Sequence, residues 1–540
     1  MHTKRRTLEL LAAGVALAAV ALATVSCDSG KKDPAPAPGG TVVVGLLGDP
    51  KSLNPLVAAS IESRNVIELL FLKLLEEQGD FVSFQPKLAK GWQFGADSLT
   101  VTFALRDDVA WSDGKPVTAH DVLYTWELQV DTLVAWPNRS VKERIAGEEV
   151  IDEYTVRYRF TGRYPYQLMD ANDGVILPKH VLEKVPRAEI RDCAFGRNPV
   201  GNGPYRLSRW EPEQFVELER NPEYYERGLP RLDRVVFRIV PDMTALVTQL
   251  ESGEIDCLES LSLEAAAEIR ADHPEIRIYT YPSRQQLFIA WNLRKPLFSS
   301  PDVRRALAMA VNTEEMIQTL WGGMARVSNG PMHPGLWAHD PAIPAIPFDP
   351  GEAQALLAAN GWADHDGDGV LDNGGMRLEF EMIANQGNRL RADVMTMIQE
   401  YLRRIGVRVV VRTFEWNTFV EKITTGDFAS CVFGWKAATK ADLTDLWRST
   451  SAPPAGFNVP RYANAEVDSL IDLARNSLDV DEARRLWFRC QRIIFEDQPV
   501  LFLAVPYEVV GLHRRFCGVE PNAIGFFVNL PEWYEADVCP

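Results

Sequence analysis

The hydrophobic positions of the first half of the chain follow two different periods. A β-branched run at 41–47 (TVVVGLL) ends at a Gly-Asp-Pro turn, which predicts a buried strand. From about Ser63 to Leu74, apolar residues recur at helical spacing and predict a helix. Alternation of apolar and polar residues predicts further, half-buried strands at 99–105, 154–160, 214–219 and 235–240.

The later part of the chain is dominated by helical periods. The stretch 299–321 opens with a serine cap and a proline, and acidic residues mark the start of its second part. Helical periodicity also predicts helices at 349–360, 389–405, 464–477 and 480–495. Because strands alternate with helices at both ends of the chain, the pattern favours α/β lobes over a sandwich or a bundle.

The first forty residues have the order of an export signal. A basic start at residues 4–6 precedes a short apolar run at 10–23. The run ends in Thr-Val-Ser-Cys27, which resembles the lipobox of bacterial lipoproteins, so Cys27 is predicted to carry lipid; an ordinary signal peptide is the alternative. Residues 28–40 are rich in Pro, Ala and Gly and predict a spacer. We therefore expect a periplasmic or extracytoplasmic protein that Cys27 anchors to the membrane.

Charge and cysteine content narrow the class of protein. The formal net charge of -17 disfavours nucleic-acid binding, which needs a basic surface to meet phosphate. Six cysteines follow Cys27, and an oxidising compartment permits disulfides among them. The sequence does not choose the pairing, and Cys517 with Cys539, close together near the C-terminus, is the pair we expect first.

Three blocks carry a resemblance to a known family. The block 99–127 contains a strand, an aromatic plug at Trp111, a tight Ser-Asp-Gly turn and a cap for the next helix. The block 198–225 contains a glycine turn, a hairpin and an Asn-Pro-aromatic close, and 288–312 reads as a strand followed by a helix. In this order the blocks resemble the family 5 solute-binding proteins, which include the dipeptide and oligopeptide receptors of ABC importers.

The resemblance implies an α/β fold of the two-lobe, periplasmic-binding-protein type, with a subdomain inserted in lobe one. It also implies a monomeric subunit that captures short peptides between closing lobes and delivers them to the permease and ATPase subunits of the importer. The chain would cross between the lobes near residues 290 and 505. The implied boundaries are lobe one at 41–77, 199–289 and 506–540, the inserted subdomain at 78–198, and lobe two at 290–505.

The ligand-binding motif of peptide-binding members departs from its pattern here. In the family, a Gly-Trp pair is followed three residues later by an aspartate that holds the α-amine of the ligand. Trp435 matches the motif, whereas Ala438 stands at the aspartate position and Lys436 adds a positive charge. A buried ammonium without a partner is costly. We therefore predict that a free N-terminus is not read in the usual way, unless Asp442 or Asp445 reaches in.

Other candidate contacts follow from the same resemblance. They are Ser60 and Ile61 on lobe one, Trp136 on the inserted subdomain, and Phe502 at the second crossing. Core packing is the alternative for each of them, since most aromatic side chains of a large protein are buried. The fold does not decide the cargo, so a nickel chelate, haem, an oligosaccharide or an opine-like solute stays an alternative to a peptide.

An acidic loop predicts a metal site of a different kind. The loop starting at Asp364 has carboxylates at positions one, three, five and nine of an EF-hand-like pattern, supplied by Asp364, Asp366, Asp368 and Asp372. Gly375 stands where a bidentate glutamate is expected. We expect either a structural calcium ion or an Asp/Gly-rich surface turn.

Signals of catalysis are not found in the sequence. HExxH, GxSxG, GxGxxG and Walker motifs do not occur, and the histidines are scattered. We therefore expect a binding protein that needs no cofactor rather than an enzyme.

Overall fold

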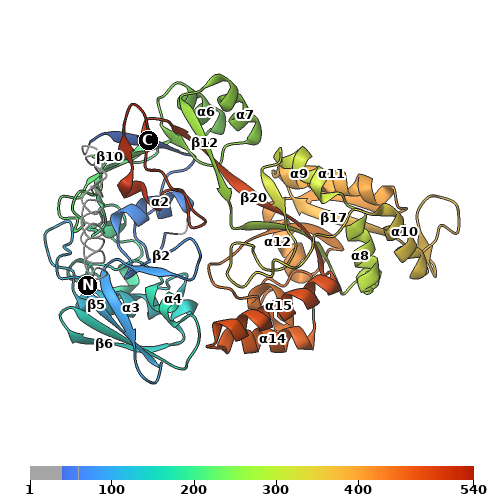
Figure 1. Cartoon of the computed structure of the whole chain (residues 1–540), viewed down its shortest axis with the longest axis horizontal. Coiled ribbons are helices and arrows are strands. Elements are labelled where there is room, and N and C mark those ends of the chain that lie inside the picture. Colours follow the sequence, from blue (N-terminus) through green and yellow to red (C-terminus); the bar gives the residue numbers. More distant parts are fainter. Residues whose placement is uncertain (1–38, 59, 540) are drawn as a thin grey trace, which may run out of the picture. The chain divides into compact units, whose positions relative to one another are not determined.

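The computed structural model describes residues 39–58 and 60–539, and Figure 1 shows the order of their helices and strands. The predicted lipidation site Cys27 and most of the predicted spacer lie outside the described residues. Within the part of the chain that is described, no helix is both long and apolar enough to cross a membrane.

One mixed sheet of twelve strands is the frame of the fold. Its order is β18-β17-β19-β13-β20-β11-β1-β10-β9-β8, and β12 and β14 pair with β20 outside this order. The strands of its first half are β1 (Thr41–Leu46), β8 (Tyr205–Glu211), β9 (Phe215–Arg220), β10 (Arg234–Ile239), β11 (Cys257–Leu258) and β12 (Ile276–Pro282). The strands of its second half are β13 (Gln285–Trp291), β14 (Ala325–Val327), β17 (Glu379–Asn385), β18 (Arg408–Phe414) and β19 (Ser430–Lys436).

A single long strand, β20 (Val500–His513), joins the two halves of this sheet (Figure 1). Its residues from Val500 to Ala504 pair with β13, and those from Tyr507 to His513 pair with β12. Between β12 and β13 the chain contains only Ser283 and Arg284. The halves are therefore connected through two neighbouring segments, the β12–β13 connection and β20. The lobe boundaries expected from the resemblance stay a prediction.

A second, antiparallel sheet has the order β4-β5-β7-β6. Its strands are β4 (Ala89–Phe94), β5 (Thr100–Leu105), β6 (Ile145–Asp152) and β7 (Thr155–Phe160). Helix α3 (Ala119–Val130) packs on β6 and β7 and begins at a capping box, in which the Thr118 N–H donates to Asp121 Oδ2 at 2.9 Å. Trp111 is fully buried, and the Gly114 N–H closes the turn after it on the Trp111 carbonyl at 2.8 Å. The predicted plug, turn and cap are thus confirmed.

The remaining helices flank the sheets. In the first half they are α2 (Ile61–Leu70), α4 (Gln167–Asn172), α5 (Lys179–Leu182), α6 (Met243–Glu251) and α7 (Leu263–Asp272). In the second half they are α8 (Pro301–Met309), α9 (Thr313–Trp321), α10 (Pro350–Ala359), α11 (Arg389–Arg403), α12 (Trp416–Thr425), α13 (Thr444–Trp447), α14 (Ala465–Asn476) and α15 (Val480–Asp497). Helices α14 and α15 lie side by side (Figure 1).

The predicted elements agree with the observed ones except that the helix predicted from about Ser63 to Leu74 ends at Leu70, where Phe71 takes an extended conformation. The α/β class is confirmed. The stretch 299–321 forms two helices, α8 and α9, with Asn312 as the cap between them. The predicted serine cap differs in one detail. Ser300 occupies the N-cap position of α8, but its hydroxyl donates to Asn360 Oδ1 at 3.0 Å instead of capping the helix.

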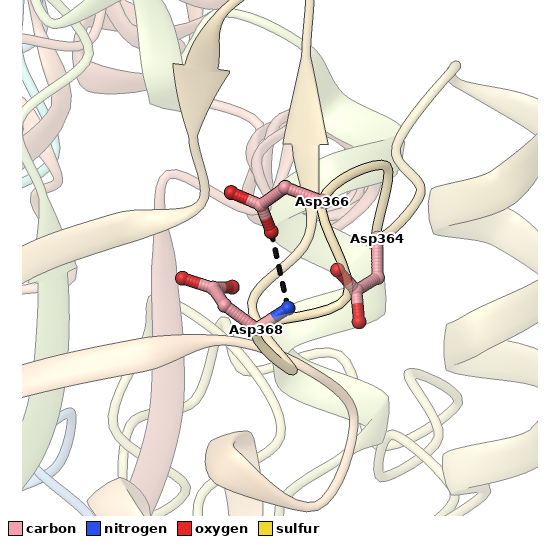
Figure 2. A group of neighbouring side chains, drawn as sticks. All are labelled: Asp364, Asp366 and Asp368. Carbon is pink, nitrogen blue, oxygen red and sulfur yellow. Dashed lines mark hydrogen bonds between the residues drawn. The ribbon is translucent and has the colours of Figure 1, made fainter.

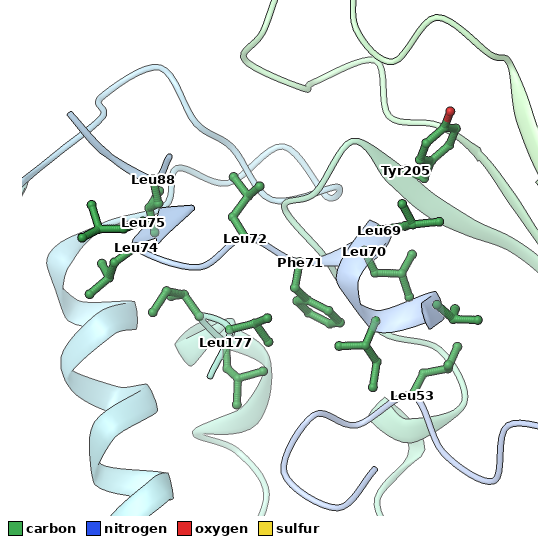
Figure 3. Close-up of a cluster of buried hydrophobic side chains, with 14 of the residues drawn as sticks. Leu53, Leu69, Leu70, Phe71, Leu72, Leu74, Leu75, Leu88, Leu177 and Tyr205 are labelled. Atoms are coloured by element: carbon green, nitrogen blue, oxygen red, sulfur yellow. The ribbon is translucent and has the colours of Figure 1, made fainter. Parts of the chain in front are cut away.

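The glycine turn at 201–203 is hydrogen-bonded to the end of α2 and to the residues directly after it. The Gly203 N–H donates to the Leu70 carbonyl at 2.8 Å. The Asn202 side chain accepts from the Leu72 N–H at 2.8 Å. The carbonyl of the first glycine of this turn accepts from the Ser112 N–H at 2.7 Å. The apolar side chains at the end of α2 and directly after it are buried, and Figure 3 shows them in a row: Leu69, Leu70, Phe71, Leu72 and Leu74.

The expected disulfide between Cys517 and Cys539 is confirmed. It links the segment after β20 to the end of the described chain. The other cysteines of the described chain are free thiols: Cys193, Cys257, Cys431 and Cys490.

Candidate functional site

A cleft of about 290 Å³ lies beside the connection between β12 and β13. Its walls come from the end of β1, the first turns of α2, the residues after β11, the β12–β13 connection, β20 and the loop at 523–528. The second half of the sheet contributes two lining residues, Gln285 from the first position of β13 and Lys436 from the last position of β19. The cleft therefore lies where the two halves of the sheet are connected.

Charged side chains of both signs line this cleft. The acidic ones are Glu62, Glu68, Glu259 and Glu508, and the basic ones are Arg64, Arg284 and Lys436. Among the residues that the structure describes, none of these seven has an ion-pair partner within 4.0 Å. We call Glu259 and Glu508 the acidic pair, and Arg64, Arg284 and Lys436 the basic trio.

The acidic pair is held in surroundings that disfavour its charge. Glu259 follows β11 and accepts a hydrogen bond from Asn65 Nδ2 on α2 at 2.9 Å. Burial raises the pKa of Glu259 to about 7, and the nearby carboxylate of Glu508 acts in the same direction. Burial also raises the pKa of Glu508, which projects from β20. A cationic group entering the cleft would stabilise both carboxylates.

The surroundings of the basic trio also disfavour its charge. Burial lowers the pKa of Lys436, and the positive charges of Arg284 and Arg64 lower it further. Burial likewise lowers the pKa of Arg284. Lys436 ends β19 and Arg284 immediately precedes β13, and the two residues are close because Lys436 pairs with Gln285 and the Ala437 N–H donates to the Arg284 carbonyl at 2.8 Å. An anionic group in the cleft would stabilise this side.

Two of the six predicted ligand contacts line the cleft. They are Lys436 and Ile61, whose side chain is 51% exposed at the start of α2. Ser60 is the N-cap of the same helix, where its hydroxyl accepts from the Ser63 N–H at 3.2 Å. Ser60 therefore fixes the start of the helix that supplies much of the wall.

The three predicted aromatic contacts lie away from the cleft lining. Trp435 projects from β19 next to Lys436 but packs on Phe457, with ring centroids 4.5 Å apart. Trp136 and Phe502 are 7% and 3% exposed and belong to hydrophobic clusters. Packing is the role that the structure shows for them, and contact with a ligand stays a prediction.

The carboxylates of the cleft come from an unexpected part of the chain. Asp442 and Asp445, the two carboxylates that the sequence offered for the ligand's amine, do not line the cleft. Asp442 pairs with Arg475 at 3.1 Å. The acidic pair comes from β20 and from the residues after β11, both far from Ala438 in sequence. No local motif marks these two glutamates, because the cleft is assembled from segments that are distant along the chain.

The acidic loop of the second half brings three carboxylates together (Figure 2). One oxygen from each lies within 4.8 Å of the others: Asp364, Asp366 and Asp368. The fourth predicted ligand, Asp372, is outside this group and accepts hydrogen bonds from the backbone and ring of His365 at 3.2 and 3.0 Å. Asp368 also pairs with Arg377. Calcium binding by this loop stays a prediction.

Comparison with known proteins gives the family. The model of the bacterial extracellular solute-binding proteins, family 5, matches residues 83–457. The oligopeptide-binding protein AppA of Bacillus subtilis is 29% identical over 536 residues, which cover 98% of this chain and 97% of the relative. Its structure in complex with a nonapeptide superposes with a TM-score of 0.74 and 28% identity, over 93% of this chain and all of that one.

Two other relatives differ in cargo. The glutathione-binding protein GsiB of Salmonella typhimurium is 27% identical over 500 residues, covering 90% of this chain and 92% of the relative. The structure of NikZ from Campylobacter jejuni in complex with Ni(L-His) has a TM-score of 0.76 and 25% identity, over 92% of this chain and 99% of that one. The chain belongs to family 5 of the bacterial extracellular solute-binding proteins, which bind solutes outside the cytoplasm.

Proposed function

We propose that this protein captures a short peptide for an ATP-driven importer. The cleft carries the proposal, because unpaired carboxylates and unpaired cations line the same small space. A short peptide with free ends offers an ammonium group and a carboxylate, so it satisfies both signs of charge. AppA and GsiB, named for oligopeptides and for glutathione, support a peptide over other solutes.

In this proposal the peptide is bound and released unchanged, and the permease and ATPase subunits of the importer are the partners in the membrane. The shared strand β20 and the β12–β13 connection provide the segments about which the halves close on the cargo. Lipidation of Cys27 keeps the protein near its permease. Lys436 fits this picture, since it is the charged lining residue that belongs to the second half.

Native mass spectrometry of the protein lacking residues 1–27 tests the cargo. We expect the purified protein to carry a heterogeneous set of short peptides that mild denaturation releases. Protein unfolded, washed and refolded before the measurement is the control and should be free of them. A nickel chelate, haem, an oligosaccharide or an opine-like compound as the released species would contradict the peptide cargo and select the corresponding alternative.

We also propose that the acidic loop binds calcium as a structural ion. The three clustered carboxylates carry this proposal, and Arg377 would give up its contact with Asp368 when the ion enters. Saturating Ca²⁺ should raise the Tm by roughly 2–5 °C relative to EDTA, because an ion that binds only the folded state stabilises it. The variant Asp364→Asn should lose this difference. Equal Tm values in Ca²⁺ and EDTA for the unmodified protein would refute the site.

A further inference from the structure

We propose, building on the peptide cargo above, that this cleft binds both charged ends of a di- or tripeptide. The acidic pair receives the ammonium end, and the basic trio receives the carboxylate end. The ligand class is thus a very short peptide with both ends free.

The acidic pair is suited to an ammonium group. Asn65 holds Glu259 through Oε2 at 2.9 Å, which orients the carboxylate while Oε1 keeps its capacity to accept. Neither member of the pair has an ion-pair partner within 4.0 Å among the described residues. Half-buried carboxylates without a cation are costly, and the cost falls when a ligand brings the cation. The raised pKa of Glu259, about 7, has the same cause.

The basic trio joins three separate parts of the fold. Arg64 comes from α2, Arg284 from the connection between β12 and β13, and Lys436 from the end of β19. A carboxylate held by all three contacts both halves of the sheet, because Lys436 belongs to the second half. The carboxylate end of the ligand therefore couples binding to the relative position of the halves.

The size of the cleft favours a short ligand. Its volume of about 290 Å³ is at the lower end of ligand cavities, which span ~300–1,000 Å³. This volume favours a peptide of two or three residues if both of its ends are held inside the cleft. The AppA structure contains a nonapeptide, so the proposal separates this protein from that relative in the length of its cargo.

Binding of a randomised tripeptide mixture with modified ends tests the proposal. The mixture is offered in three forms: free, N-acetylated and C-amidated. The unmodified protein should bind the free form at least about tenfold more tightly than either blocked form, the effect of losing hydrogen bonds to a charged group. Glu259→Gln should lose the preference against the N-acetylated form only, and Lys436→Met the preference against the C-amidated form only.

The variants are chosen to keep the fold. Glutamine at 259 still accepts from Asn65 Nδ2, and Glu508→Gln repeats the test at the other member of the pair. Glu264→Gln, at an exposed position in the first turn of α7, is the matched control and should behave as the unmodified protein. Thermal unfolding confirms that each variant is folded before its binding is interpreted.

A pH series gives a second readout. Binding of the free tripeptides should weaken as the pH falls through about 7, because Glu259 becomes neutral and no longer attracts ammonium. This dependence should shrink in Glu259→Gln. The other titratable or charged groups that line the cleft are Glu62, Glu68, Glu508, Tyr281, Lys436, Arg64 and Arg284.

The outcomes distinguish this inference from the function on which it rests. If the folded protein binds none of the three tripeptide forms, both the peptide cargo and the reading of its ends are overturned. If it binds all forms equally, or if Glu259→Gln and Glu508→Gln keep the full preference against N-acetylation, only the reading of both ends is overturned.

Discussion

Replacing Gly201 by alanine is expected to prevent stable folding, with a loss of more than about 4 kcal/mol in the free energy of unfolding. The added Cβ would lie 2.1 Å from the Leu70 carbonyl oxygen and 3.1 Å from its carbon. These are backbone atoms, so no side-chain rotation relieves the clash. Relief would require moving α2 away from the glycine turn, which would break the hydrogen bonds that join them.

Gly147→Ala is the matched control for this substitution. A Cβ at Gly147 on β6 would meet nothing within 4 Å, so this variant should stay within about 0.5 kcal/mol of the unmodified protein. Urea unfolding followed by circular dichroism measures both variants, together with the soluble yield. A Gly201→Ala protein with an unfolding midpoint near that of Gly147→Ala would show that the turn can move at little cost.

Phe502→Ala is expected to lower the free energy of unfolding by about 3–5 kcal/mol, as for other large side chains removed from a core. Phe502 is 3% exposed, and its ring centroid lies 5.9 Å from those of Phe288 and of Trp447. The residue is on β20, so the cavity left by alanine would open beside the strand that connects both halves. Little relaxation is expected there, because β20 is paired on both sides.

The same variant separates a packing role from the ligand contact that the family resemblance implies. Phe94→Ala, at a side chain 43% exposed on β4, is the control and should change stability by less than about 0.5 kcal/mol. Denaturant unfolding gives the stability, and tripeptide binding is measured where each variant is fully folded. Unchanged stability combined with lost binding in Phe502→Ala would favour the ligand contact.

Elements with a clear period were predictable from the sequence. The alternation at 99–105 corresponds to β5, where Val101, Phe103 and Leu105 are buried. Such strands have one buried face, so the side-chain pattern reports the structure directly. In the second half, α8 to α11 and α14 and α15 were predicted from their helical periods, whereas α12 and α13 were not.

Strand β20 has no such period. Its first residues (VLFLAV) are buried on both faces, so apolar and polar residues do not alternate along it. The length of the apolar run is then the remaining sign of a strand. Pro506 would normally argue against a central strand. It is accommodated because the partner of β20 changes there, from β13 before this residue to β12 after it. A sequence pattern does not contain that exchange of partners.

The cleft was harder to predict than the fold. Lys436 was found because it stands beside a recognisable Gly-Trp motif, whereas Glu259 follows a strand of only two residues and has no motif around it. Glu259 and Glu508 are far apart in sequence and come together through the pairing of β11 with β20. Charges that meet through sheet pairing become visible only once the order of the strands is known.

The position of β20 in the chain also has a consequence for biosynthesis. Four strands pair with it, namely β11, β12, β13 and β14, and all of them leave the ribosome long before Val500 does. Their edges stay open while at least about 170 further residues are translated, from Val327 at the end of β14 to Val500, so the main sheet cannot close before β20 is made. The arrival of this one late strand then completes both halves together.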